Sequence, residues 1–153
     1  MENFFHLDIL LQLFEYRALA FVIRTGERLE RLNSSMPPAE ARNLCAQDLV
    51  QCSRVHCFFL IFQSFVGEVK LAEDPDVRIA LENLCAFFGA LHIQENGGDW
   101  LGFLTAEQME WVKEATRILL GKLRPNLIAF TDAFEFPDNV LNSALGRFDG
   151  NVY

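Results

Sequence analysis

Two cysteines and a histidine occur close together in the middle of the sequence, where they could share one face of a helix. Cys52 and His56 are four residues apart and Cys57 adjoins them, and side chains at this spacing are neighbours on a helix. A structural zinc site needs four such ligands, and the other histidines, His6 and His92, have no ligand-like spacing to this group. A cysteine nucleophile with a histidine base would need an exposed cleft, whereas this stretch is the most apolar of the chain. We therefore interpret the three side chains as parts of a packed core.

Four carboxylates gather near the C-terminus, at Asp132, Glu135, Asp138 and Asp149. Paired carboxylates can act in acid–base catalysis when burial raises the pKa of one of them. These four are spread around a proline and a glycine turn, where carboxylates more often cap helices or face water. The glycine pair at 97–98 lacks the preceding strand and the further glycines of a phosphate-binding loop. The sequence thus predicts no catalytic, cofactor-binding or metal-binding residue in this chain.

Near the end of the chain, residues 146–150 are expected to form a polar turn bounded by glycines, and three further residues follow it. Gly146 and Gly150 suit backbone positions with positive φ, and between them stands Arg147, whose planar guanidinium makes charge-assisted hydrogen bonds of fixed geometry. In one interpretation Arg147 pairs with Asp149 or caps a helix carbonyl within the domain. In the other, the turn presents a surface to another domain or subunit. The candidate interface residues are Arg147, Asp149, Asn151 and Tyr153.

These residues must be positioned by helices, because apolar residues recur along the chain with the helical period and no strand pattern of useful length appears. An Asp-Pro start signal and a Thr-Ala-Glu-Gln capping box mark two of the helix beginnings. The four long helices are expected at Leu7–Leu32, about Ala39–Leu71, Asp74 to about Gln94, and Thr105 to about Leu123.

Two short helices are expected beyond Pro125, which breaks the path of the chain. They cover Ile128–Phe134 and Asn139–Leu145, with Phe136 and Pro137 between them. The predicted fold is an all-α bundle of four main helices plus two short C-terminal helices, in a single domain of residues 1–153.

The second long helix is expected at the centre of this bundle, because its second half is apolar on all sides. Its densest apolar run, Val55–Val66, is twelve residues long, whereas a bilayer span needs about 20 residues. Its phenylalanines should therefore lie in the core, as should a stripe on the third helix. The core positions concerned are Phe58, Phe59, Phe62 and Phe65 on the second helix and Val77, Leu81, Leu84, Phe88 and Leu91 on the third.

The composition indicates a globular protein of a reducing compartment. Apolar residues make up 51% of the 153 residues, and 15 phenylalanines supply large core side chains. The net charge of −8 and the pI of about 4.8 disfavour nucleic acid and anionic lipid as partners. Four cysteines with no C-x-x-C pair are typical of free thiols.

Two motifs carry a resemblance to a known family. The order D-A-F-E-F-P-D followed by L-N-S-A-L-G-R-F-D-G-N-V-Y, within residues 132–153, resembles the C-terminal helical domain of the peroxisomal acyl-CoA oxidases. The segment Phe14-Glu15-Tyr16-Arg17-Ala18 is similar to the F-E-x-R-A helix that opens the same domain. The two motifs bracket nearly the whole chain.

The resemblance implies a flavoenzyme of fatty-acid β-oxidation. Members convert an acyl-CoA and O2 to a trans-2-enoyl-CoA and H2O2: a glutamate removes the α proton, FAD accepts the β hydride, and oxygen reoxidises the flavin. The family's catalytic glutamate and most FAD and CoA contacts lie in preceding domains, so no catalytic residue transfers to this chain. The C-terminal domain instead packs on the rest of the subunit and helps to build a homodimer, which implies that this chain is inert alone.

Two departures from the family pattern leave an alternative open. Met1 begins just where the family's C-terminal domain would begin. Members usually continue beyond D-G-N-V-Y through another helix, often to a peroxisomal S-K-L-type signal, whereas this sequence stops at Tyr153. The expected location is peroxisomal by resemblance, with the cytoplasm as the alternative. The alternative function is a non-enzymatic, oxidase-like interaction module made as a short product.

Overall fold

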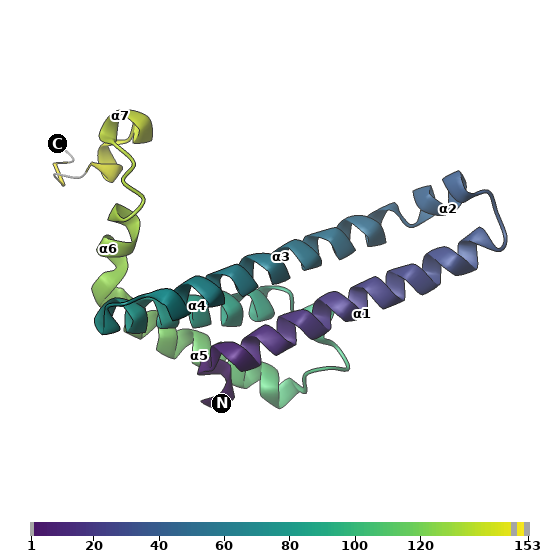
Figure 1. Ribbon diagram of the computed structural model, residues 1–153, viewed down its shortest axis with the longest axis horizontal. Helices are drawn as coiled ribbons and strands as arrows, with labels where there is room; N and C mark the ends of the chain where they lie inside the picture. The colour runs from purple at the N-terminus through teal and green to yellow at the C-terminus, as the bar shows by residue number, and fades with distance from the viewer. Residues whose placement is uncertain (1, 148–149, 152–153) are drawn as a thin grey trace.

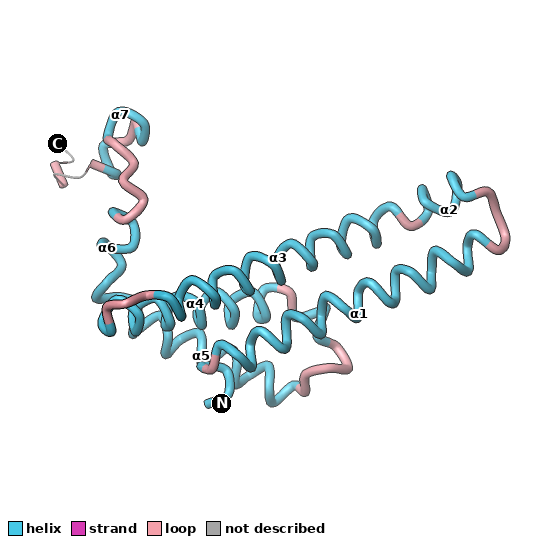
Figure 2. Tube along the Cα trace, viewed as in Figure 1, coloured by secondary structure: helices cyan, strands magenta, loops and turns pink. Residues whose placement is uncertain are grey.

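The protein is helical almost throughout residues 2–147, 150 and 151, which are the residues that the computed structural model describes (Figures 1 and 2). No described residue belongs to a β-strand, and one isolated bridge joins Leu101 and Leu104. The expected all-α fold is confirmed. The long helices are α1 (Leu7–Asn33), α3 (Ala46–Leu71), α4 (Pro75–Glu95) and α5 (Ala106–Leu123). The short helical segments are η1 (Glu2–Phe5), α2 (Pro38–Leu44), η2 (Gly97–Trp100), η3 (Arg124–Asn126), α6 (Leu127–Asp132), α7 (Asp138–Leu141) and η4 (Ala144–Gly146).

Both helix starts with a capping signal lie where the sequence predicted them. The Asp74 carboxylate accepts hydrogen bonds from the backbone N–H groups of Asp76 and Val77, at 2.8 and 3.0 Å. At the start of α5, the Gln108 N–H donates to the Thr105 hydroxyl at 3.1 Å, and the Thr105 N–H donates to the Gln108 side chain at 2.8 Å. These bonds satisfy amide groups that have no partner within the helix.

The predicted second helix is two helices. A turn at Cys45, with φ −94° and ψ 3°, separates α2 from α3. Ala41 and Cys45 are fully buried, and α2 packs against both α1 and α3. The change of direction at Cys45 therefore lets α2 bury its small side chains, and helical periodicity alone does not reveal such a turn.

The core lies where α1, α3 and α4 approach one another. The rings of Phe14 and Phe62 stack with their centroids 4.6 Å apart, and Leu10 is fully buried beside them. Gly89 of α4 faces this group: a Cβ atom there would lie 3.0 Å from the Phe62 ring and 3.2 Å from Leu10. The absence of a side chain at Gly89 thus allows α4 to approach α1 and α3 closely.

The position of α3 differs from the prediction. Only Val55, Phe62, Val66 and Val69 of this helix are buried, whereas Ile61 is 51% exposed. The helix packs against α1 and α4 with one side, and no described element covers the other. By length and composition alone α3 could cross a membrane, and 17% of its most apolar stretch is buried inside the protein. Since a helix that is apolar all round needs neighbours all round, the pattern predicted a covering of α3 that the described residues do not supply.

The buried face of α4 also differs from the predicted stripe. Val77 is 51% exposed, and the other predicted positions, Leu81, Leu84, Phe88 and Leu91, are half-buried. The most buried residues are instead Cys85, Ala86, Gly89, Ala90, His92 and Ile93. Small residues line the centre of this face because the helices cross closely there, so the largest apolar side chains pack around the crossing.

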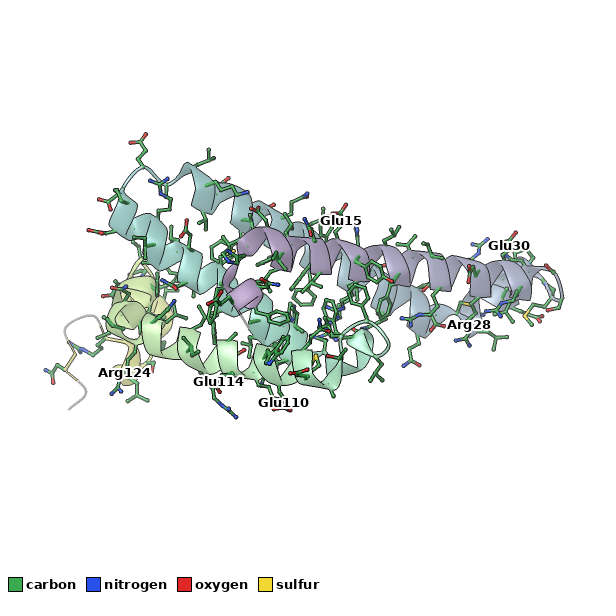
Figure 3. All side chains as sticks on the ribbon, turned by 90° about the horizontal axis from the view of Figure 1, so that it is seen from below. Glu15, Arg28, Glu30, Glu110, Glu114 and Arg124 are labelled. Atoms are coloured by element: carbon green, nitrogen blue, oxygen red, sulfur yellow. The ribbon has the colours of Figure 1, made fainter. Side chains whose placement is uncertain are left out.

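Most charged side chains lie on the outside of the bundle, as Figure 3 shows for Glu15, Glu110 and Glu114. On α5, Lys113 binds the Glu110 carboxylate at 2.6 Å and Arg117 binds that of Glu114 at 2.9 Å, both between exposed side chains. Such surface pairs stabilise a helix only slightly. The bundle is therefore held together mainly by its apolar core.

The close approach at Gly89 predicts different responses to alanine at two helical glycines. Gly67→Ala on α3 should stabilise the protein by about 1 kcal/mol, because nothing lies within 4 Å of the added Cβ and alanine favours a helix. Gly89→Ala should instead lower stability by about 1–2 kcal/mol, since overpacking against two buried side chains outweighs that gain. Urea unfolding followed by circular dichroism measures both, and equal stabilisation of the two variants would contradict the packing described here.

Candidate functional site

The C-terminal segment, residues 127–147, forms an arm that leaves the end of α5 and projects away from the four long helices (Figure 1). It contains α6, α7 and η4. Its large apolar side chains are exposed, as Phe134 at 71% and Leu145 at 87% illustrate. No residue of this arm has a buried side chain among those the structure describes. The arm is therefore not stabilised by a core of its own.

A concavity of about 1310 Å³ lies within this arm. The rings of Phe134 and Phe136 stack with centroids 6.0 Å apart, on the turn where Glu135 adopts a φ of 50°. The lining mixes exposed apolar side chains with a few charged ones. It is formed by Ile128, Thr131, Asp132, Phe134, Glu135, Phe136, Pro137, Asn139, Leu141, Leu145, Gly146, Arg147 and Gly150.

The structure describes two of the four predicted interface residues, Arg147 and Asn151. Arg147 is exposed and lines the concavity, and Asn151 is exposed. Asp149 and Tyr153 lie outside the described residues, so the predicted Arg147–Asp149 pairing stays a prediction. Of the acidic cluster, Asp132 and Glu135 are exposed.

The two glycines of the terminal turn have different roles. Gly150 adopts the expected positive φ, at 67°, and its N–H donates to the Arg147 carbonyl at 3.1 Å. Gly146 is not among the residues with positive φ, so that expectation is wrong. A Cβ at Gly146 would lie 3.3 Å from the Leu141 side chain, which indicates that close contact with α7 favours glycine there.

The core interpretation of the cysteine–histidine group is also wrong for two of its members. His56 and Cys57 are exposed and Cys52 is half-buried, because the group lies at the uncovered side of α3. The buried thiols are those of Cys45 and Cys85, and burial raises the pKa of Cys85 to about 12. Among the described residues, no three His, Cys, Asp or Glu side chains come close enough together to hold a metal ion.

A buried ion pair connects α1 to the loop after α4, and the sequence analysis did not single it out. The Arg17 side chain is 3% exposed. Its Nε donates to Asp99 Oδ2 at 3.0 Å and its Nη2 donates to the same oxygen, while its guanidinium lies over the Trp100 ring, 5.5 Å from the centroid. The F-E-x-R-A segment could have revealed this pair, because Arg17 lies one helical turn after Phe14 and therefore on the same, apolar face of the helix. A charge on a buried face needs a partner of opposite charge.

His92 is buried close to this ion pair. Its ring meets the Phe58 ring edge-on, with centroids 3.8 Å apart, and the Asn96 side-chain nitrogen lies 3.2 Å from Nδ1. Nε2 has no hydrogen-bond partner among the described residues. Burial, aided by the positive charges of Arg17 and Arg54 and opposed by Glu95, lowers the pKa of His92 below its ordinary value of 6.5. The folded protein thus favours the neutral imidazole.

The comparisons with known proteins agree on one family. The model of the acyl-CoA oxidase family matches residues 6–153. The chain belongs to the acyl-CoA oxidase family. Peroxisomal acyl-coenzyme A oxidase 1 of Mus musculus is 37% identical over 150 residues, covering 96% of this chain and 23% of that protein. Its namesake in Arabidopsis thaliana is 31% identical over 157 residues, covering 99% and 23%.

Solved oxidase structures share the fold. Acyl-CoA oxidase 1 of Yarrowia lipolytica superimposes with a TM-score of 0.91 at 27% identity, covering 99% of this chain and 22% of that one. Acyl-CoA oxidase 2 of Caenorhabditis elegans, solved with FAD, ascaroside-CoA and ATP, gives a TM-score of 0.90 at 29% identity, covering 97% and 23%. The chain thus spans less than a quarter of the length of these relatives, and the resemblance inferred from the sequence motifs is confirmed.

The Arg17–Asp99 pair should contribute more to stability than a surface pair. Asp99→Asn removes the countercharge of a buried guanidinium and should lower stability by about 3 kcal/mol. Asp48→Asn breaks the pair with Arg28, whose side chains are 36% and 51% exposed, and should cost less than about 1 kcal/mol. Urea unfolding of both variants checks this, and equal losses would show that burial of Arg17 does not matter.

The lowered pKa of His92 predicts a loss of stability in mild acid. As the pH falls below 6.5, the unfolded chain binds a proton at this histidine before the folded protein does, so stability decreases by at most about 1.4 kcal/mol per pH unit. The loss stops once the pH passes the folded pKa. The free energy of unfolding, measured across this pH range, should depend less steeply on pH in His92→Leu than in the unmodified protein. His56→Leu, at an exposed position, is the matched control, and an unchanged slope in His92→Leu would contradict the prediction.

Proposed function

We propose that this chain is the C-terminal helical domain of a flavin-dependent acyl-CoA oxidase of fatty-acid β-oxidation. The observation that carries the proposal is the match in both sequence and fold to nearly the whole of this chain and less than a quarter of each relative. In this proposal the parent protein converts acyl-CoA and O2 to trans-2-enoyl-CoA and H2O2 in the peroxisome, the location named for the relatives. The chain contributes packing and dimer assembly and is inert alone.

Two uncovered apolar surfaces support a role in assembly. One is the outer side of α3, with Ile61, Leu60 and Val50, and the other is the arm, with Phe134 and Leu145. Clusters of large exposed apolar side chains mark contacts with another surface. The two lie at different places on the molecule (Figure 1), so that other domains and a second subunit could each cover one of them.

The two concavities described in this chain do not suit FAD. In the arm, Asp132 and Glu135 stand beside Arg147, an excess of negative charge that disfavours a pyrophosphate. The other concavity, beside Arg17, is about 140 Å³, below the roughly 300–1,000 Å³ of sites for drug-sized ligands. We assign FAD, the catalytic glutamate and the acyl-CoA site to other domains of the parent protein, and we derive no catalytic step from the residues described here.

The test is the mass and visible absorbance of the endogenous protein, isolated with an antibody against residues 147–153. A yellow species much heavier than 17.5 kDa is expected, because the flavin belongs to the parent enzyme. A colourless 17.5 kDa species would overturn the proposal and favour the non-enzymatic interaction module. As a separate check, the isolated chain mixed with FAD and acyl-CoA should release no hydrogen peroxide, and peroxide release would show that it is not inert alone.

A further inference from the structure

The outer side of α3, which no described element covers, carries an unbroken seam of uncharged residues. Its exposed positions follow one another at alternating steps of four and three residues along the whole helix, the spacing by which a helix presents a seam to a partner helix. The seam consists of Ala46, Val50, Ser53, Cys57, Leu60, Ser64, Gly67 and Leu71. Because the face of a helix that meets water is normally charged, this seam is expected to lie against another helix.

Large and small side chains are distributed on the seam so that its two halves complement each other. When two copies of α3 run antiparallel about the midpoint between Cys57 and Leu60, every large side chain of the seam meets a small one. The facing pairs are Leu60 with the partner's Cys57, Val50 with the partner's Gly67, Leu71 with the partner's Ala46, and Ser53 with the partner's Ser64. Large side chains that fit into the spaces beside small ones allow two helices to approach closely.

The same seam does not suit a parallel pair of helices. In a parallel pair each residue would face its own copy, so that leucine would meet leucine at Leu60 and glycine would meet glycine at Gly67. The large side chains would then hold the helices apart, and the small ones would leave gaps that lower stability. The seam therefore favours an antiparallel second copy of α3, which is related to the first by a two-fold axis as in most dimers.

The charged side chains of α3 agree with this arrangement. Asp48 and Lys70 have ion-pair partners within the chain, whereas Arg54 and Glu68 form no ion pair with a described residue. These two lie fourteen residues apart and hence on the same edge of the seam. In the antiparallel pair, Arg54 lies five residues, or about 7.5 Å along the axis, from the partner's Glu68. The pair thus brings opposite charges together at the edge of the seam and keeps like charges farther apart.

We propose that the outer side of α3 pairs antiparallel with α3 of a second copy of this chain, about a two-fold axis between Cys57 and Leu60. The inference rests on the proposed function, in which this chain takes part in dimer assembly, and it names the surface that the second subunit covers. The arm is then the surface left for the other domains of the parent protein.

Sedimentation equilibrium of the 153-residue chain tests whether this surface carries self-association. The chain should dimerise reversibly, and Leu60→Glu should weaken the dimer at least about tenfold, because a carboxylate buried in the seam would have no partner. Leu120→Glu on α5 is the matched control, at a leucine of similar exposure (52% against 44%), and should leave the dimer unchanged. A monomer at every concentration up to about 1 mM, or equal effects of the two variants, would overturn the proposal.

Disulfide cross-linking tests the direction of the pair. In a background with Cys52→Ser and Cys57→Ser, chains carrying Ser53→Cys are mixed with ¹⁵N-labelled chains carrying Ser64→Cys and oxidised, and mass spectrometry distinguishes the products. The antiparallel pair places the two positions opposite each other and separates identical positions by about 16 Å along the axis, too far for a disulfide. Mixed dimers should therefore predominate, and an excess of identical-chain dimers, or no disulfide dimer, would overturn the proposal.

Failure of the α3 pairing and failure of the proposed function give different results. Both measurements use this chain alone, without flavin or acyl-CoA, so a monomeric chain would overturn the pairing and leave the assignment to a flavin oxidase standing. A colourless endogenous protein of 17.5 kDa would overturn that assignment whatever the oligomeric state of the chain.

Discussion

The close approach of three helices at Gly89 is the constraint on which the rest of the fold depends. A Cβ atom there would lie within 3.2 Å of both Phe62 and Leu10, so the spacing of α4 from α1 and α3 is set by the absence of a side chain. This spacing allows Phe14 and Phe62 to stack at the centre. Because protein interiors are closely packed, this contact leaves little room for another arrangement of these helices.

The buried Arg17–Asp99 pair extends this constraint to the loop between α4 and α5. Its partners are 82 residues apart in the chain, and a charge removed from water must keep its partner close. The pair thereby holds η2 against α1, with Trp100 beneath the guanidinium.

The uncovered side of α3 and the projecting arm expose apolar surface that, in the function proposed here, other parts of the parent protein cover. Both carry large apolar side chains that no described element buries, whereas the opposite side of α3 packs on α1 and α4. The relatives in the acyl-CoA oxidase family extend well beyond the part that this chain matches. In a helix that neighbouring domains cover, apolar residues stand at positions that the helix's own domain leaves exposed. The sequence of α3 is therefore as apolar as that of a helix buried on all sides.

The sequence by itself determined the all-α class, the four long helices and the family, because helical periodicity, the caps at Asp74 and Thr105 and the terminal motif are local features. It did not determine which faces are buried. The turn at Cys45, the inward face of α4 and the exposure of His56 depend on how helices meet, and the Arg17–Asp99 pair joins residues far apart in the chain. Only the tertiary structure decided these points, since the burial of a side chain depends on its neighbours in space and not on its own type.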